Sequence, residues 1–229
     1  MKFIFFVGII CMSIIGCDLK LSNTVWNNVA EIAEFVVCGE VDNISVSLMC
    51  GRREVSYSLD GVANQLIPYG IITVFVPEDM IVENIDYTIF VGVDKFEGVM
   101  EKNPYDNSWA ADIKTMVNKN ENISIDLYCN GAKYSTKLKP IDDNWIISTN
   151  EIIDKILIAD YKEQVKSFIK DGKFAAEVFV KLINDRDNGN SQYYCFVSIQ
   201  GREDNTISIL VSPQTAEVLA SSLIGVEDY

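Results

Sequence analysis

The stretch Ile123-Ser-Ile-Asp-Leu-Tyr-Cys129, followed by Asn130-Gly131, carries the clearest fold signal in this chain. Its apolar residues stand at every second position, which is typical of a strand with one buried face and one wet face. Asn-Gly suits a type I′ turn because both residues tolerate a positive φ. The alternation resumes at Lys133-Tyr134. We therefore predict a β-hairpin centred on residues 130–131.

The same alternation extends outward from this hairpin through residues 38–140. It recurs at 44–50, 54–59 and 87–93, and the run 71–76 is apolar on both faces, as expected for a central strand. Seven or eight short strands in about 100 residues are typical of a β-sandwich. We therefore predict that residues 38–140 form an antiparallel β-sandwich domain.

Part of this domain resembles a known module. Residues 87–138 are similar to the Ig-like β-sandwich modules that are common in bacterial surface proteins, although the Cys-Trp-Cys signature of antibody domains is absent. The resemblance rests on Tyr87-Thr-Ile-Phe90, Phe96-Glu-Gly98, Trp109-Ala-Ala-Asp-Ile113 and Asn130-Gly-Ala-Lys-Tyr134. It implies an Ig-like sandwich.

A second domain is expected at residues 148–229, after a polar linker that begins at Pro140. Ser148-Thr-Asn-Glu151 has the spacing of a capping box, and apolar residues then follow helical spacing until Asp171-Gly172, a typical helix stop. Three alternating runs come next, at residues 174–182, 193–200 and 207–211, and residues 215–223 are either a strand or a short helix. A helix followed by three antiparallel strands predicts an α+β domain, and the predicted fold class of the chain is α+β.

The last part of this domain resembles PepSY domains. These typically end with aspartate, proline, a variable residue, threonine, glycine, a variable residue and aliphatics. Pro213, Thr215, Val218 and Leu219 match that pattern, whereas Ser212 and Ala216 stand in place of the usual aspartate and glycine. PepSY domains occur in exported bacterial proteins and are thought to modulate peptidases or to act as propeptide-like chaperones.

The N-terminus indicates export. Lys2 precedes an apolar run from Phe3 to Ile15, which is too short to span a bilayer but suits the h-region of a signal peptide. The run ends in Ile14-Ile-Gly-Cys17, which resembles the lipobox of bacterial lipoproteins. By that resemblance, residues 1–16 are a signal peptide, and Cys17 carries a diacylglycerol that anchors the protein stably to the bilayer. Residues 17–37 are then the anchor and a helical or irregular lead-in.

An ordinary secretory signal is the alternative interpretation of this N-terminus. Asn43-Ile-Ser45 and Asn122-Ile-Ser124 are glycosylation sequons in that case. The lipoprotein interpretation places the protein in the cell envelope, on the extracytoplasmic face of the membrane.

The composition excludes several classes of protein. The chain carries 33 acidic and 19 basic residues, a net charge of −14, which repels nucleic acid. It contains no histidine, which removes Ser-His-Asp and Cys-His catalysis and histidine-ligated metal sites. Four cysteines remain beside Cys11 and Cys17, without the Cys-x-x-Cys spacing of a metal site, and they are either buried thiols or disulfides. We expect no cofactor, no metal and no enzymatic activity.

Two pairs of residues are candidates for binding. Tyr194 and Phe196 alternate on one strand and face either the core or an exposed binding surface. Arg52 and Arg53 are the only adjacent arginines, and they are either an anion site or solvated turn residues.

The sequence therefore favours a non-enzymatic surface lipoprotein that presents loops or sheet edges to a protein or cell-wall partner. The alternative is a secreted hydrolase that uses carboxylates alone, which requires two of them in one pocket. A ligand-binding component of a transporter is disfavoured because its two-lobed fold needs βαβ alternation.

Overall fold

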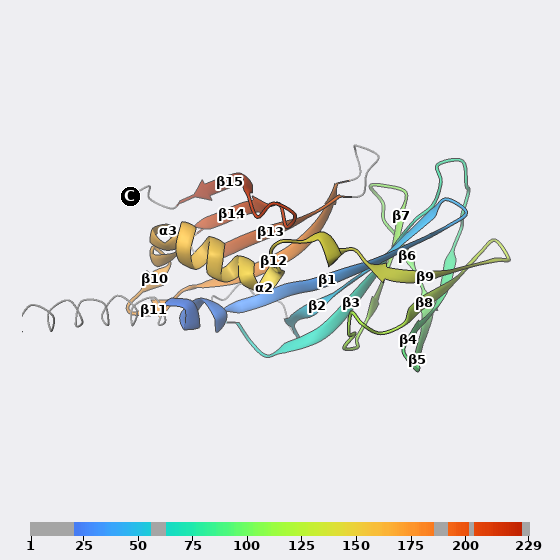
Figure 1. Cartoon of the computed structure of the whole chain (residues 1–229), viewed down its shortest axis with the longest axis horizontal. Coiled ribbons are helices and arrows are strands. Elements are labelled where there is room, and N and C mark those ends of the chain that lie inside the picture. Colours follow the sequence, from blue (N-terminus) through green and yellow to red (C-terminus); the bar gives the residue numbers. More distant parts are fainter. Residues whose placement is uncertain (1–20, 56–62, 186–191, 202–203, 226–229) are drawn as a thin grey trace, which may run out of the picture. The chain divides into compact units, whose positions relative to one another are not determined.

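Strands dominate the computed structural model, which describes residues 21–55, 63–185, 192–201 and 204–225 (Figure 1). The strands are β1 (Val29–Val41), β2 (Ile44–Glu54), β3 (Leu66–Phe75), β4 (Ile85–Val91), β5 (Asp94–Val99), β6 (Glu101–Lys102), β7 (Ser108–Ile113), β8 (Ile123–Cys129), β9 (Ala132–Pro140), β10 (Ile169–Lys170), β11 (Lys173–Phe174), β12 (Ala176–Asp185), β13 (Gln192–Gly201), β14 (Thr206–Val211) and β15 (Val218–Ile224). The helical segments are η1 (Asp142–Asn144), α2 (Thr149–Ile152), η2 (Ile153–Asp160) and α3 (Lys162–Lys166). Residues 21–26 are also helical.

The chain divides into two compact units. The first unit combines Met1–Ile32, Glu54–Leu66 and Ile146–Tyr229, and the second unit combines Ala33–Arg53 and Ile67–Trp145. The expected linker after Pro140 contains one of the passages between the units, at Trp145 and Ile146. The separate folding of residues 38–140 and 148–229 stays a prediction.

The sheet of the first unit has the order β15-β14-β13-β12-β1. The pairs within β12–β15 are antiparallel, and β1 pairs with β12 in parallel through Val29 opposite Val178 and Ile32 opposite Val180. Figure 1 shows α2, η2 and α3 along this sheet, and their apolar residues Ile152, Ile156 and Val165 are fully buried. Burial of this apolar helix surface is what holds the helical segment on the sheet.

The capping box that the sequence predicts is present. The Ser148 hydroxyl accepts a hydrogen bond from the Glu151 backbone N–H, and the Glu151 carboxylate accepts one from the Ser148 backbone N–H. The helix differs from the expectation at its other end, because α3 stops at Lys166. Asp171 and Gly172, which both have positive φ, form instead the two-residue turn between β10 and β11. The Asp-Gly pair is typical both of the end of a helix and of a two-residue hairpin turn, and in this structure it forms the hairpin turn.

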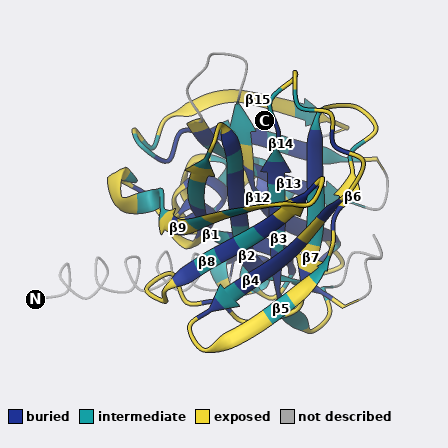
Figure 2. Ribbon diagram, turned by 90° about the vertical axis from the view of Figure 1, so that its right-hand side faces the viewer, coloured by how far each residue is buried: buried dark blue, intermediate teal, exposed yellow. Residues whose placement is uncertain are grey.

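The second unit has the strand order β5-β4-β8-β9-β1-β2-β3-β7-β6. The predicted hairpin is confirmed: Cys129 pairs with Ala132, and Asn130 and Gly131 both have positive φ. Side chains from both ends of this order, such as Ile89 and Trp109, belong to one buried core. The sheet therefore curls around its core. Figure 2 shows β4 and β8 largely buried and β5 largely exposed.

The lead-in expected at residues 17–37 is wrong beyond residue 28. Instead of a helical or irregular segment, the chain forms β1, whose first nine residues are buried except Glu34. The two glutamates among these nine residues, Glu31 and Glu34, stand three residues apart among apolar residues, so the run has no period of two and its spacing does not separate a strand from a helix. β1 pairs in parallel with β12 and antiparallel with β9, through Cys38 opposite Lys139.

The predicted α+β class is therefore wrong. Among the described residues, hydrogen bonds link thirteen strands into a mixed sheet, and the longest helical stretch is 149–160. The expected Ig-like antiparallel sandwich, which has two separate sheets, is also wrong. The pairing of β1 with β9 joins the strands into one curled sheet. The three strands expected after the helix are present as β12, β13 and β14, but β1 and β15 extend their sheet on both sides. These additions come from segments whose sequence pattern was ambiguous.

Candidate functional site

Tyr194 and Phe196 lie on β13 and share one face of the first unit's sheet. The other face of β13 carries Tyr193, Cys195, Val197 and Ile199, which are all buried. Tyr194 and Phe196 are half-buried, so they are neither core residues nor freely projecting ones. The sheet face opposite to the fully buried one thus carries two partly exposed aromatic side chains, whereas Ser198, farther along the same face, is buried.

Residues of the neighbouring strands complete an apolar row across this face. Ile183 stands opposite Tyr194, Leu210 stands opposite Phe196, and Ala220 stands opposite Leu210. Ile183 is 43% exposed, Leu210 is half-buried and Ala220 is exposed. We call Ile183, Tyr194, Phe196, Leu210 and Ala220 the apolar stripe. Its members come from four strands that are adjacent in the sheet.

The sequence analysis missed Ile183, Leu210 and Ala220. Strand alternation showed which residues of each strand share a face, but it did not show which residues stand opposite one another. Register in a hairpin follows from turn type and loop length. Six residues, 186–191, connect β12 to β13 in the sequence and lie outside the described part, and a connection of that length is longer than the two-residue turns that fix a hairpin register.

A charged pair lies beside the stripe. Lys181 of β12 stands opposite Phe196, and its ammonium lies 3.3 Å from the Glu31 carboxylate. Glu31 itself is buried on β1. Because a buried carboxylate requires a partner, this pair holds the Lys181 side chain toward β1 rather than across the stripe.

Arg52 and Arg53 lie on β2 in the second unit, and each guanidinium forms an ion pair with a carboxylate. The Nε of Arg52 lies 2.7 Å from the Glu34 carboxylate, and an Nη of Arg53 lies 2.7 Å from the Asp112 carboxylate. Arg53 also lies over the Tyr69 ring, 4.8 Å from its centre. An anion at either arginine would therefore share the guanidinium with a carboxylate that is already paired with it. Anion binding by these arginines stays a prediction.

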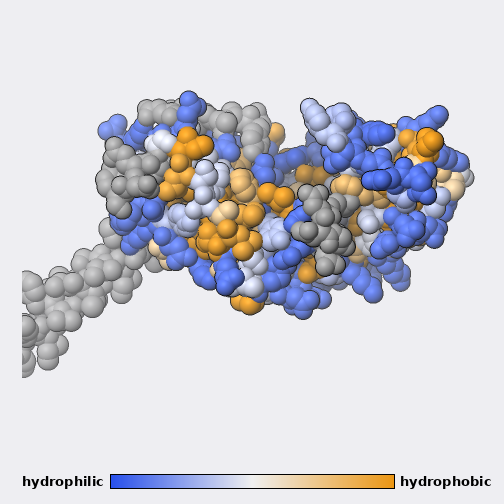
Figure 3. All heavy atoms as spheres, turned by 90° about the horizontal axis from the view of Figure 1, so that it is seen from above, coloured by the Kyte–Doolittle hydropathy of each residue, from blue (hydrophilic) through white to orange (hydrophobic). Residues whose placement is uncertain are grey.

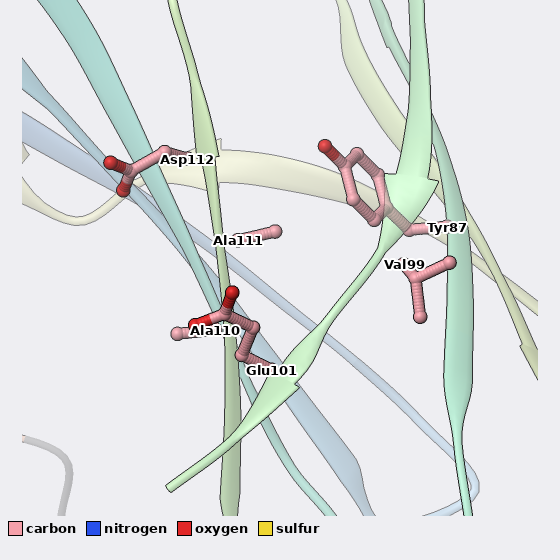
Figure 4. A pocket seen from close by; sticks show the side chains of 6 residues that line it. All are labelled: Tyr87, Val99, Glu101, Ala110, Ala111 and Asp112. Carbon is pink, nitrogen blue, oxygen red and sulfur yellow. The ribbon is translucent and has the colours of Figure 1, made fainter.

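A hollow of about 320 Å³ lies in the second unit, where the two ends of the curled sheet approach each other (Figure 4). It is lined by Tyr87, Val99, Glu101, Ala110, Ala111 and Asp112. In Figure 4, Glu101 lies beside Ala110, and Ala111 lies between Glu101 and Asp112. Burial and the nearby Asp112 raise the pKa of the Tyr87 hydroxyl. Two carboxylates therefore line one hollow, but Asp112 is already ion-paired with Arg53.

Among the described residues no disulfide joins two cysteines, and Cys50, Cys129 and Cys195 are free thiols. Burial raises the pKa of Cys50 to about 12, with a smaller contribution from Glu34, and burial alone does the same for Cys195. Burial also raises the pKa of Cys129. Because the thiolate is the nucleophile, these three cysteines are suited to packing and not to catalysis.

Within the described ranges, no group of three or more Cys, Asp or Glu residues is arranged to hold a metal ion. The residues that follow Asp185, among them Asp187, lie outside the described part as far as residue 191. Cys17, the expected lipidation site, also lies outside it. No helix among the described residues has both the length and the apolar character to cross a membrane.

Comparisons of this chain with family models, with curated proteins and with solved structures found no match.

Proposed function

We propose that the protein is a membrane-anchored binding module of the cell envelope, and that the apolar stripe of the first unit binds a protein partner. The anchor is a lipid on Cys17, on the extracytoplasmic side of the membrane. The module has no catalytic role in this proposal.

The single observation that carries the proposal is the apolar stripe itself. Where an antiparallel sheet has one face in contact with water, the side chains on that face are normally polar. Here Tyr194, Phe196 and Leu210 stay partly exposed in a chain with a net charge of −14. Aromatic residues are enriched at the centres of protein interfaces, where their large surfaces are removed from water.

The position of the first unit relative to the proposed anchor supports a role at the membrane surface. The helical residues 21–26 are bound to the first unit, because Trp26 Nε1 and the Ser22 hydroxyl both donate to the Asp154 carboxylate, at 3.1 Å and 3.2 Å. Leu21 and Val25 are buried. A chain spans at most about 3.6 Å per residue, so Leu21 lies within roughly 15 Å of a lipidated Cys17. The first unit would therefore act close to the bilayer.

The hydrolase alternative has weaker support. The hollow in the second unit brings Glu101 and Asp112 to one place, which is what a carboxylate-dependent hydrolase needs. Yet the 2.7 Å ion pair with Arg53 occupies Asp112. If the alternative were correct, Glu101→Gln would abolish hydrolysis of a peptide or glycoside substrate while leaving the partner contacts of the stripe unchanged.

Site-specific photo-cross-linking of the full chain in its own membranes tests the proposal. A benzophenone amino acid at Phe196 should give a discrete adduct with another envelope protein, identified by mass spectrometry. The matched control is the same probe at Tyr105, which is 95% exposed in the second unit. The Leu210→Ser change should weaken the Phe196 adduct. Equal adducts from both probe positions, or none from Phe196, would contradict the proposal.

A further inference from the structure

β15 is the last strand of the first unit's sheet and pairs, among the described strands, with β14 alone. Six of its seven residues are exposed, and its large apolar side chains remain in contact with water: Val218 is 38% exposed, Leu219 48% and Ile224 59%. In Figure 3, which looks down on the side where Figure 1 places β15, hydrophobic residues gather among polar ones over the first unit. An outermost strand presents a row of backbone N–H and C=O groups that another strand can pair with.

The other terminal strands are protected by charge, and β15 is not. β5 carries Asp94, Lys95 and Glu97, and β6 consists of Glu101 and Lys102. Charged side chains on an outer strand discourage a second chain from pairing there. β15 has the sequence Val-Leu-Ala-Ser-Ser-Leu-Ile, with no charged residue, in a chain where 23% of residues are charged. Among the described outer strands, β15 is therefore the one whose edge is suited to accept another strand.

The order of side chains in β15 indicates which strand that is. Read from its two ends toward Ser221, the strand is nearly symmetric in character. We propose that β15 pairs antiparallel with β15 of a second copy of this chain, with a two-fold axis at Ser221. Val218 then stands opposite Ile224, Leu219 opposite Leu223, Ala220 opposite Ser222, and Ser221 opposite itself.

This register places large apolar side chains opposite one another and keeps like charges apart. A shift of one residue places Leu223 opposite Ala220 and Val218 opposite Gly225, so it loses contacts between large apolar side chains, which stabilise cross-strand pairs. In the proposed register, Glu217 faces Gly225, so the strand ends do not bring like charges together. For two copies that each carry −14, an uncharged strand is where close approach costs least electrostatic repulsion.

The pairing uses the edge of the sheet, and the proposed partner contact uses its face, so the two proposals stand independently. The result is a sheet that continues from one copy into the next, with main-chain hydrogen bonds across the two-fold axis. Strand addition of this kind is a common mode of recognition because it satisfies backbone groups that are otherwise left to water.

Cross-linking through a single cysteine tests the register. Directly opposed residues in an antiparallel pair have Cα atoms about 4.5–5.5 Å apart, within the range that a disulfide bridges. The full chain with Ser221→Cys should form a disulfide-linked dimer in membranes under mild oxidation. The matched control is Glu97→Cys, which places a thiol on the charged edge strand β5. Equal dimer formation by the two variants, or a reactive Cys at 221 that forms no dimer, would overturn the proposal.

Charge reversal tests the same contact without a covalent bond. Ser221→Lys and Ser221→Asp each place like charges on the two-fold axis, and each should reduce co-purification of two differently tagged copies at least tenfold. Co-expression of the two variants should restore co-purification, because lysine then faces aspartate. Since Ser221 is exposed, the thermal midpoints of the variants should match the unchanged protein. Co-purification that is unaffected by either charge would contradict the proposed two-fold contact.

Discussion

Ala216 occupies a backbone conformation that favours glycine. Its φ is +59°, in the turn between β14 and β15, where its N–H donates to the Ser212 carbonyl at 2.7 Å. The Ser212 hydroxyl accepts from the Thr215 N–H in the same turn. A left-handed residue with a Cβ costs about 1–2 kcal/mol, so this turn holds local strain.

Replacing Ala216 with glycine should stabilise the protein. The relief of the left-handed conformation exceeds the extra chain entropy that glycine loses on folding, so we expect Ala216→Gly to raise the free energy of unfolding by about 0.5–1 kcal/mol. Ala159→Gly, at an exposed helical position, is the control and should lower it by a similar amount. Denaturant titration measures the free energy of unfolding of both variants. A lower value for Ala216→Gly than for the unchanged protein would show that the positive φ of Ala216 does not destabilise the turn.

The buried thiols should resist modification until the protein opens. Because burial holds the pKa of Cys50 and Cys195 at about 12, almost no thiolate forms at neutral pH. Cys38 is less buried than the other three described cysteines. Alkylation followed by peptide mass spectrometry should label Cys38 first, and Cys50 and Cys195 only in denaturant. Rapid labelling of Cys195 in the native protein would contradict its burial.

At the scale of single elements, the capping box determines where the long helical segment begins. Ser148 and Glu151 satisfy each other's backbone N–H groups, which would otherwise lack partners at a helix start. Ser148→Ala should lower the free energy of unfolding by about 1 kcal/mol, while Ser148→Thr should retain most of it. Equal losses in both variants would show that the hydroxyl is not the stabilising group.

The effect of this cap should also depend on pH. Hydrogen bonds from the Ser148 backbone and hydroxyl lower the pKa of the Glu151 carboxyl. A carboxyl whose folded-state pKa is lowered stabilises the fold above its unfolded pKa, and this stabilisation is lost as the pH falls through the folded pKa. The difference between Ser148→Ala and the unchanged protein should therefore shrink in acid. A difference that stays constant down to complete protonation of Glu151 would contradict this role.

At the scale of the whole molecule, β1 ties distant parts of the chain together. It pairs with β9, which precedes the Trp145–Ile146 passage, and with β12, which follows it. Asp143 and Asn144 are exposed there, and Ile146 is 71% exposed. Limited proteolysis should cut at 143–146, and the two fragments should elute together until denaturant is added. If the two fragments separate in native buffer, the hydrogen bonds between β1 and β12 are not sufficient to keep them together.

Membrane attachment is the other property of the whole chain. If Cys17 carries the lipid, Cys17→Ala should shift the protein from the membrane fraction to the soluble fraction, or leave it unprocessed at that residue. Two acyl chains bury enough CH₂ groups for stable anchoring, so a processed chain that lacks the lipid should lose stable membrane association. Ser13→Ala, within the same apolar run, is the control and should behave as the unchanged protein. Identical processing and partitioning of Cys17→Ala would contradict the lipoprotein proposal.

The sequence by itself determined the features that depend on neighbouring residues. Alternation located β8, β12, β13 and β14, the Asn130-Gly131 pair specified its own turn, and Ser148 with Glu151 marked a helix start. Each of these rests on a side-chain period or a local hydrogen bond. Asp171-Gly172 was misjudged because the same two residues suit a helix stop and a hairpin turn.

Only the tertiary structure decided which strands meet. Strand pairing joins β1 to both β9 and β12, and it brings Ile183, Leu210 and Ala220 beside Tyr194 and Phe196. Hydrogen bonds between strands form between residues that are far apart in the chain. Because the backbone N–H and C=O groups are chemically alike along the chain, they do not specify which strand they pair with. The fold class and the apolar stripe therefore depend on register and strand order, which residue type and local spacing leave open.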